Sequence, residues 1–165
     1  MECEHKLISD LMPDLVIEVA SRSEASDILC SPDRCAEVTF LISIGAPNDE
    51  LPMGYHNISS KLRLLFGDTL DAETGATEVD VRTLIELAQN LRSSKGKVLI
   101  HCEAGVSRST AAALILYACW LGRGRECEAM RRVLSQRPIA IPNRRMVELA
   151  DHLLKLSGRL LAALG

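Results

Sequence analysis

Residues 97–120 read KVLI HCEAGVSRST AAALILYACW, and the order of these three segments decides the fold. The first four residues are typical of a short buried strand, and residues 110–120 are typical of a buried helix. Between them lies a loop of mostly small residues that contains Cys102 and Arg108. A loop that joins a strand to a helix N-terminus turns its backbone N–H groups inward, as phosphate-binding turns do. The stretch therefore predicts an anion-binding cup with a cysteine at its base.

The spacing of cysteine and arginine is by itself a weak signal, because the chain repeats it from Cys119 to Arg125. This second copy follows a predicted helix, and its glycines fall where a helix ends rather than where one begins. We expect Cys119 to be an inert core cysteine. The copy at Cys102 has a strand before it, a helix after it and Gly105 where the loop must turn.

Length and composition indicate one globular domain over residues 1–165, since 47% of the residues are hydrophobic and 25% are charged. The net charge of −3 gives no general reason to expect binding to nucleic acid or to an anionic membrane. Residues 1–6 lack the pattern of a signal peptide, and residues 111–121 are too few to span a bilayer. The 6 cysteines form no Cys-x-x-Cys pair, so we expect free thiols and a cytoplasmic location.

Strand and helix patterns alternate along the chain. Strands are expected over residues 14–19, 35–44, 61–66 and 97–100, and helices over residues 23–29, 77–91, 110–120, 126–135 and 143–156. The fold class is therefore α/β, with a central, mostly parallel sheet flanked by helices. Loops at the carboxyl ends of parallel strands meet at one edge of the sheet, so Asp68 and Cys102, which follow different strands, are expected to meet.

Cys102 is the candidate nucleophile, because a helix N-terminus and a nearby arginine are the influences that lower the pKa of a thiol. Arg108 supplies a planar fork that grips two phosphoryl oxygens. Ser109 is placed to donate a hydrogen bond to the departing thiolate. The loop residues expected to bind the phosphoryl group, besides Arg108, are Glu103, Ala104, Gly105, Val106 and Ser107.

Asp68 is the best candidate for the acid that protonates the leaving oxygen, and Asp71 is the alternative. His101 is expected to point away from the cup and to hold the loop through a hydrogen bond. Asn143 is placed to cap the last long helix. Whether Cys30, Cys35 or Cys127 forms a redox pair with Cys102 is left open.

The run from His101 through Cys102 to Arg108 and Ser109 resembles the signature of cysteine-based protein tyrosine phosphatases, and the compact chain looks like their dual-specificity branch and its small bacterial relatives. The resemblance covers residues 38–156. It implies a dual-specificity-phosphatase-like fold and hydrolysis through a phosphocysteine intermediate, with no metal or cofactor. The Trp-Pro-Asp loop of larger members is absent, and Phe66-Gly67-Asp68 stands in its place.

The expected function is hydrolysis of phosphotyrosine in a phosphorylated protein or peptide, with phosphoserine and phosphothreonine left open as further substrates. Two alternatives remain. One is a phosphatase of a non-protein ester, such as an inositol phosphate, although the signature loop has no lysine to favour a polyanionic head group. The other is a non-catalytic module that uses the same cup to dock a phosphate. The oligomeric state is left open.

Overall fold

The computed structural model describes residues 12–165. Residues 1–11 lie outside this range, and with them Cys3 and the segment in which a signal pattern was sought. Among the described residues, no helix is both long enough and apolar enough to cross a membrane.

The centre of the fold is a sheet of four parallel strands in the order β1-β4-β2-β3. The strands are β1 (Asp14–Ala20), β2 (Val38–Gly45), β3 (Lys61–Leu65) and β4 (Lys95–His101). This arrangement confirms the predicted α/β class and the parallel sheet. Because all four strands run in the same direction, the segments that follow β3 and β4 emerge at the same edge of the sheet.

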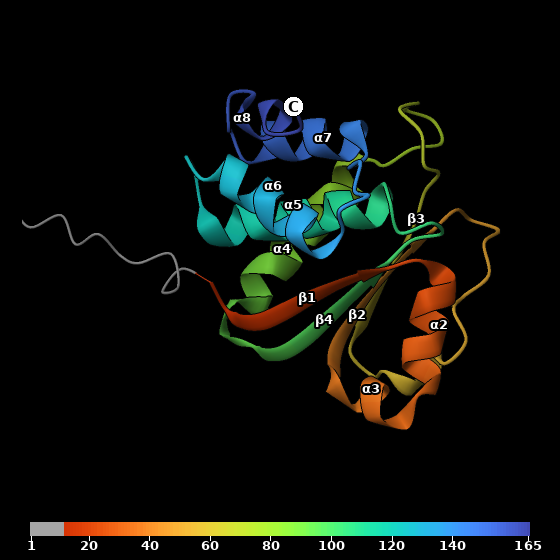
Figure 1. Ribbon diagram of the computed structural model, residues 1–165. Helices are drawn as coiled ribbons and strands as arrows, with labels where there is room; N and C mark the ends of the chain where they lie inside the picture. Colours follow the sequence, from red (N-terminus) through yellow and green to blue (C-terminus); the bar gives the residue numbers. More distant parts are fainter. Residues whose placement is uncertain (1–11) are drawn as a thin grey trace, which may run out of the picture.

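Helices cover both faces of the sheet (Figure 1). One face carries α2 (Arg22–Cys30) and α3 (Pro32–Glu37), and the other carries α4 (Glu78–Asn90), α5 (Arg108–Leu121), α6 (Glu126–Gln136), α7 (Arg144–Leu153) and α8 (Arg159–Ala162). Two short 3-10 turns, Tyr55–Asn57 and Leu91–Ser93, complete the described elements.

Helix α5 is the centre of the larger core. All but one of its residues are buried, because the helix lies between the sheet and its neighbours α4, α6 and α7. Its apolar side chains pack with Ile42, Ile100 and Cys102 in one continuous cluster. A smaller cluster, which includes Leu41 and Leu99, lies under α2 on the other face. Successive side chains of β2 and β4 therefore alternate between two apolar layers.

Two expectations about element bounds are wrong, and one short helix was not expected. Residues 35–37 were expected to open the second strand, but they end α3, which begins with Pro32 in its first turn and Asp33 beside it. The last long helix ends at Leu153 rather than at residue 156. Helix α8 was not expected, because it is capped from a distance: the Asp151 carboxylate accepts hydrogen bonds from backbone N–H groups at the start of α8.

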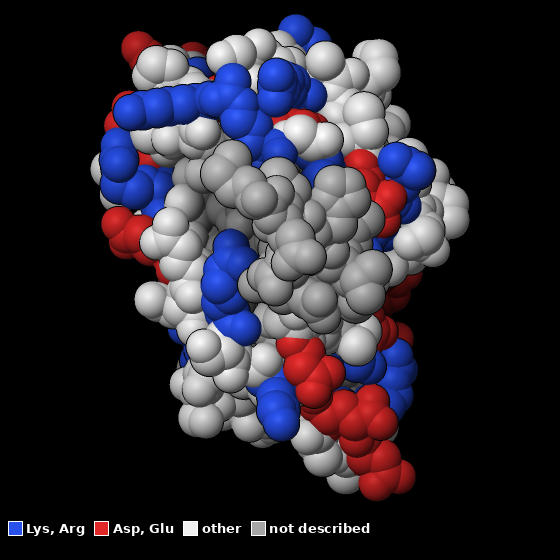
Figure 2. Space-filling model, turned by 90° about the vertical axis from the view of Figure 1, so that its left-hand side faces the viewer, with Lys and Arg blue, Asp and Glu red and all other residues white. Residues whose placement is uncertain are grey.

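Charges of both signs lie on the side of the molecule at the left of Figure 1. Where this face is drawn in colour, Asp and Glu border the Lys and Arg side chains, and no single basic surface covers it (Figure 2). This mixture agrees with the small net charge of −3.

Candidate active site

Cys102 follows the last residue of β4 and lies at the base of the loop that leads into α5. Its side chain is 3% exposed, and its Sγ lies 3.1 Å from the Ser109 Oγ in the first turn of α5. A hydroxyl at this distance can donate a hydrogen bond to a thiolate. The expected proximity of Ser109 to the sulfur is therefore confirmed.

Gly105 allows the loop to turn tightly against the end of β1. Its φ is +70°, in the left-handed region that side chains disfavour. A Cβ added here would lie 2.7 Å from the backbone of Ala20 and 2.7 Å from that of Ser21. The position therefore requires glycine both for conformation and for space.

The outer side of the loop is held by Arg137, which follows α6. Its Nε donates to the Gly105 carbonyl at 3.0 Å, and its Nη1 forms an ion pair with Glu24 at 2.9 Å. A further hydrogen bond runs from Nη2 to the Ala104 carbonyl at 3.4 Å. Because Arg137 binds the carbonyl side of these peptides, it favours a loop whose N–H groups face the opposite way, into the cup.

Arg108 begins α5, yet it is only 5% exposed. Its Nη1 donates to the Phe66 carbonyl at 2.9 Å, which ties the Cys102 loop to the segment that contains Asp68. Its Nε is buried and has no hydrogen-bond partner among the described residues. A buried, unpaired donor of a cationic group is costly, so it indicates a place for an anion.

The first turn of α5 lacks the usual side-chain cap. Ser107 is at the N-cap position, but its hydroxyl makes no bond to the helix N–H groups. It donates instead to the Asp68 Oδ1 at 2.6 Å. Within residues 12–165, no N-cap side chain competes for the N–H groups at the start of α5, and they stay available to an anion.

Asp68 lies just after β3 and is joined to the Cys102 loop from two sides. Its Oδ1 accepts hydrogen bonds from the Ser107 hydroxyl and, at 2.9 Å, from the Asn143 Nδ2. Its Oδ2 is then the oxygen free to carry a proton. Asp71 differs, because both of its oxygens accept from Glu73 and Thr74 within its own turn. The structure brings Asp68, rather than Asp71, to the Cys102 loop.

Asn143 connects three parts of the site. Its Oδ1 accepts from the Met146 N–H at 3.1 Å and so caps α7, as expected. Its backbone N–H donates to the Ser107 carbonyl at 3.1 Å, and its Nδ2 reaches Asp68. One residue thus fixes a helix start, the signature loop and the candidate acid.

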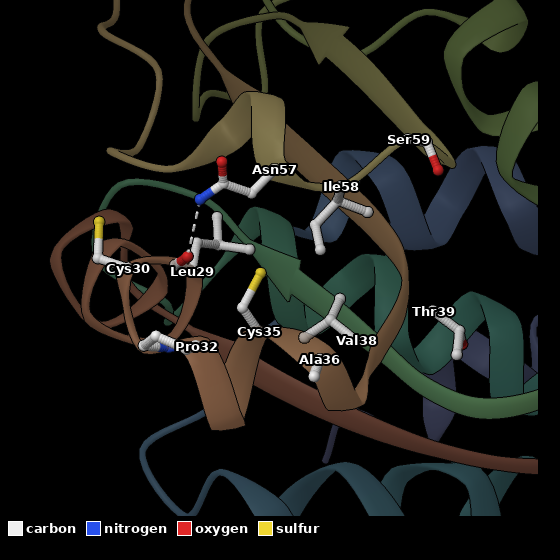
Figure 3. A pocket seen from close by; sticks show the side chains of 10 residues that line it. All are labelled: Leu29, Cys30, Pro32, Cys35, Ala36, Val38, Thr39, Asn57, Ile58 and Ser59. Carbon is white, nitrogen blue, oxygen red and sulfur yellow. Dashed lines mark hydrogen bonds between the residues drawn. The ribbon is translucent and has the colours of Figure 1, made fainter.

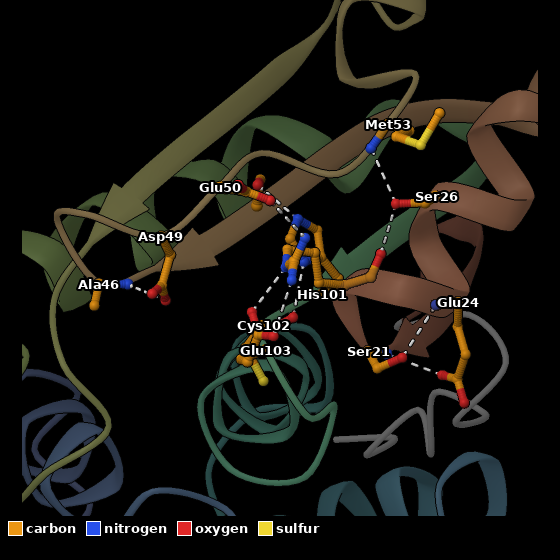
Figure 4. Close-up of polar contacts among 12 residues, drawn as sticks. Ser21, Glu24, Ser26, Ala46, Asp49, Glu50, Met53, His101, Cys102 and Glu103 are labelled. Atoms are coloured by element: carbon orange, nitrogen blue, oxygen red, sulfur yellow. Dashed lines mark hydrogen bonds and ion pairs between the residues drawn. The ribbon is translucent and has the colours of Figure 1, made fainter.

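His101 points away from the cup, as the strand alternation predicts. It is 1% exposed, and its Nδ1 lies 2.9 Å from the Cys102 carbonyl oxygen (Figure 4). Burial lowers the pKa of its imidazole below the ordinary value of 6.5. The ring is therefore neutral near pH 7, and it holds the start of the loop from behind.

Glu103 adds a negative charge beside the cup, but the structure neutralises it. Its carboxylate forms an ion pair with the Arg22 Nε at 2.9 Å, and the Arg22 backbone N–H donates to the Glu103 carbonyl at 3.0 Å. Glu50 approaches the same guanidinium at 3.6 Å (Figure 4). The Glu103 side chain is thus held by the start of α2.

The other cysteines have different surroundings from Cys102. Cys119 is only partly buried against the core, contrary to the expected core position, but burial raises the pKa of its thiol to about 11, which agrees with an inert cysteine. Cys30 and Cys35 line a separate cavity of about 520 Å³ under α2 and α3 (Figure 3). Cys127, on α6, is exposed. All five cysteines within residues 12–165 are free thiols.

Four residues that hold the loop or its neighbours were missed by sequence reasoning: Arg22, Ser43, Arg63 and Arg137. Each lies more than twenty-five residues from the signature loop, and none belongs to a local motif. The one available signal was the position of Arg22 in the first turn of a helix, where a cation is unfavourable unless an anion pairs with it.

Comparisons with known proteins agree with this fold. No protein-family model and no curated protein sequence matches the chain. Among solved structures, DUSP15 has a TM-score of 0.65 at 23% identity, with 93% of this chain and 92% of that chain covered. The human tyrosine phosphatase-like serine/threonine/tyrosine-interacting protein has a TM-score of 0.67 at 17% identity, with 89% and 95% covered. Human DUSP28 has a TM-score of 0.62 at 19% identity, with 88% and 94% covered. The chain therefore has the same fold as these dual-specificity phosphatase structures.

Proposed function

We propose that the protein is a cysteine-dependent phosphatase that hydrolyses phosphotyrosine in a protein or peptide. The observation that carries this proposal is the buried guanidinium of Arg108, whose Nε has no partner in a loop that also contains the Cys102 thiol. A buried cation with an unpaired donor, six residues after a candidate nucleophile, fits an anionic electrophile such as a phosphoryl group.

In the first step, the Cys102 thiolate attacks phosphorus and an S–P bond forms. The bond from phosphorus to the leaving oxygen breaks, and Asp68 transfers the proton on its Oδ2 to that oxygen. Arg108 and the N–H groups of the loop balance the charge on the remaining phosphoryl oxygens. The products of this step are the dephosphorylated hydroxyl and a phosphocysteine.

In the second step, water attacks phosphorus and the S–P bond breaks. Asp68, now a carboxylate, accepts a proton from that water, which regenerates the acid and yields inorganic phosphate. The Ser109 hydroxyl donates a hydrogen bond to the sulfur as it leaves as a thiolate, a role that its 3.1 Å separation supports. Ser107 and Asn143 keep Oδ1 of Asp68 fixed throughout.

The charges around the cup favour a single phosphate ester over a polyphosphorylated head group. The signature loop contains no lysine. Arg22 and Arg137, which border it, are ion-paired with Glu103 and Glu24. These pairs leave Arg108 as the cation of the cup, which suits one phosphoryl group.

Hydrolysis of a phosphotyrosine peptide in the presence of a metal chelator, with and without vanadate, tests the proposal. The wild type should turn over the peptide, vanadate should inhibit it, and Cys102→Ser should abolish turnover. Phosphoserine and phosphothreonine peptides and a soluble inositol phosphate, tested in parallel, define the substrate class. If the wild type binds vanadate but hydrolyses none of these esters, the phosphatase proposal fails and the docking module is favoured.

The acid is tested separately by comparing Asp68→Asn with Asp71→Asn. We expect Asp68→Asn to lower kcat on the phosphotyrosine peptide by a factor of roughly 10² or more, the typical contribution of a general acid. Asp71→Asn, which changes a carboxylate bound within its own turn, should have a small effect. A larger loss in Asp71→Asn would overturn the assignment of Asp68.

A further inference from the structure

Three polar side chains form a row across the sheet directly below the signature loop. Arg63 on β3 pairs in register with Ser43 on β2, and Ser43 pairs in register with His101 on β4. Residues in register on adjacent strands point to the same face of the sheet, here the face covered by α2. The row ends one residue before Cys102.

The distances place these side chains in one hydrogen-bonded chain. Arg63 Nη1 donates to Ser43 Oγ at 2.7 Å, and Ser43 Oγ lies 2.6 Å from His101 Nε2. His101 Nδ1 lies 2.9 Å from the Cys102 carbonyl oxygen.

Elementary hydrogen-bond chemistry sets the direction of every proton in this chain. A carbonyl oxygen can only accept, so His101 Nδ1 carries the proton and donates it to Cys102. In a neutral ring Nε2 is then an acceptor, so the Ser43 hydroxyl donates to it. The Ser43 oxygen in turn accepts from Arg63, a group that only donates. Each member has one arrangement that satisfies its neighbours.

Such a row is expensive to bury. Ser43 is 0% exposed and His101 is 1% exposed, and the neighbouring positions on the same face, Leu41 and Leu99, are apolar. Apolar residues would fill the row without the cost of removing polar groups from water. The stability of the sheet therefore does not explain why these three polar residues are buried. Their contact with the Cys102 peptide, where the row ends, does explain it.

We propose that Ser43 and Arg63 are positioning residues of the Cys102 loop, which act through His101. Ser43 holds His101 in the tautomer that donates to the Cys102 carbonyl. Arg63 places a positive charge at the far end, and hydrogen bonds in a chain strengthen one another in the same direction. This proposal rests on the proposed phosphatase function. It names the residues that hold the Cys102 loop in place and that polarise the Cys102 peptide.

The consequence for the thiolate follows from the peptide dipole. A Cys102 carbonyl that is bound from behind by His101 keeps its negative oxygen turned away from the sulfur. Arg63, the cation at the far end of this row of hydrogen bonds, then acts through the His101 imidazole to favour the thiolate form of Cys102. Loss of either Ser43 or Arg63 weakens this effect while leaving Cys102, Arg108 and Asp68 in place.

Other charged and titratable groups also face the chain, so a test must leave them unchanged. Tyr55, Asp49 and Arg108 lie near Arg63 and act on its charge. Glu103 and Arg22 act on His101 from the loop and from α2. Substitutions at Ser43 and Arg63 keep all five of these groups.

The test measures the rate at which iodoacetamide alkylates Cys102 as a function of pH. The Cys102 peptide is followed by mass spectrometry, because the exposed Cys30 and Cys127 react with the reagent as well. In Ser43→Ala and in Arg63→Met, the pH midpoint of alkylation should rise. The rise should be smaller than the roughly one unit that loss of a hydrogen bond to the thiolate itself would cause, because both residues act through His101. Arg63→Lys, which keeps the charge, should recover at least half of that rise.

A midpoint equal to that of the wild type in both Ser43→Ala and Arg63→Met would overturn the proposal. Arg63 is partly exposed, so Arg63→Met carries the test if Ser43→Ala does not fold. A rise of the same size in Arg63→Lys and Arg63→Met would refute the role of the Arg63 charge. Alkylation needs no substrate, so the shift can be found even if the wild type hydrolyses no phosphate ester, and the two proposals can fail separately.

Discussion

Substitution of Asn143 should affect both the stability of the protein and its catalysis, and the two effects can be measured separately. Asn143→Ala removes the oxygen that caps α7, and the Met146 N–H, in a residue that is 0% exposed, then has no partner. Loss of such a cap costs about 1–2 kcal/mol. For a chain of this size each kcal/mol lowers the melting temperature by about 2–4 °C, so we expect a fall of roughly 2–8 °C.

The same substitution removes one of the two donors that hold Asp68 Oδ1. Because Asp68 carries a proton when it acts as the acid, we take the upper end of the value for a hydrogen bond between neutral groups, about 1.5 kcal/mol. If this bond acts mainly by holding the acid in place for the transition state, kcat falls by about tenfold. The assay is steady-state hydrolysis of a phosphotyrosine peptide, with the melting temperature measured by circular dichroism.

Asn143→Ser is the matched control. Serine is also a good N-cap, but its shorter side chain lacks the amide that reaches Asp68. We expect Asn143→Ser to recover most of the melting temperature of the wild type and little of its kcat. Full turnover in Asn143→Ser would refute the positioning of Asp68 by Asn143. A melting temperature unchanged in Asn143→Ala would refute the capping argument.

Three further outcomes are expected. Arg137→Met removes the hydrogen bond to the Gly105 carbonyl and should lower kcat several-fold, as measured on the same peptide. We expect only a modest fall in the melting temperature, because the partner Glu24 is exposed and methionine keeps the apolar packing of the mostly buried Arg137 side chain. Equal kcat in the two proteins would contradict its role. Gly105→Ala should destabilise the protein by about 1–3 kcal/mol in urea denaturation, because φ is +70° and the added Cβ meets backbone atoms; a neutral result would show that the loop can relax. The pKa of His101 is lowered by burial, so its contribution to stability is present above pH 6.5 and is lost as the pH falls through its folded pKa. The melting temperature of the wild type should therefore fall on acidification. In His101→Gln, the melting temperature should fall less steeply over the same pH range.

The cup at Cys102 could be predicted because its determinants are consecutive in the chain. A strand, a loop with one obligatory glycine and a buried helix follow one another between residues 97 and 120, and each has its own local pattern. The capping role of Asn143 was predicted for the same reason, from Pro142 and the helix that follows. Asp68 was placed near the cup by a general rule, that loops after parallel strands share one edge of a sheet.

The boundary between α3 and β2 shows where local patterns become ambiguous. Residues 35–37 adjoin a long apolar strand, and their own pattern does not distinguish its extension from a last helical turn. Pro32 and Asp33, at the start of that turn, were the relevant signal. Helix α8 could not be predicted from local patterns, because the N–H groups at its start donate to the side chain of Asp151 in α7.

By itself, the sequence determined the α/β class and pointed to the candidate nucleophile, its arginine and the candidate acid, because these depend on short stretches of chain. Only the tertiary structure decided what holds them. Arg63, Ser43 and His101 lie far apart in the chain and meet because β3, β2 and β4 are neighbours in register, and Arg137 reaches Gly105 from the end of α6. A hydrogen bond between residues distant in sequence leaves no periodic signal, since its geometry exists only once the strands have paired and the helices have packed.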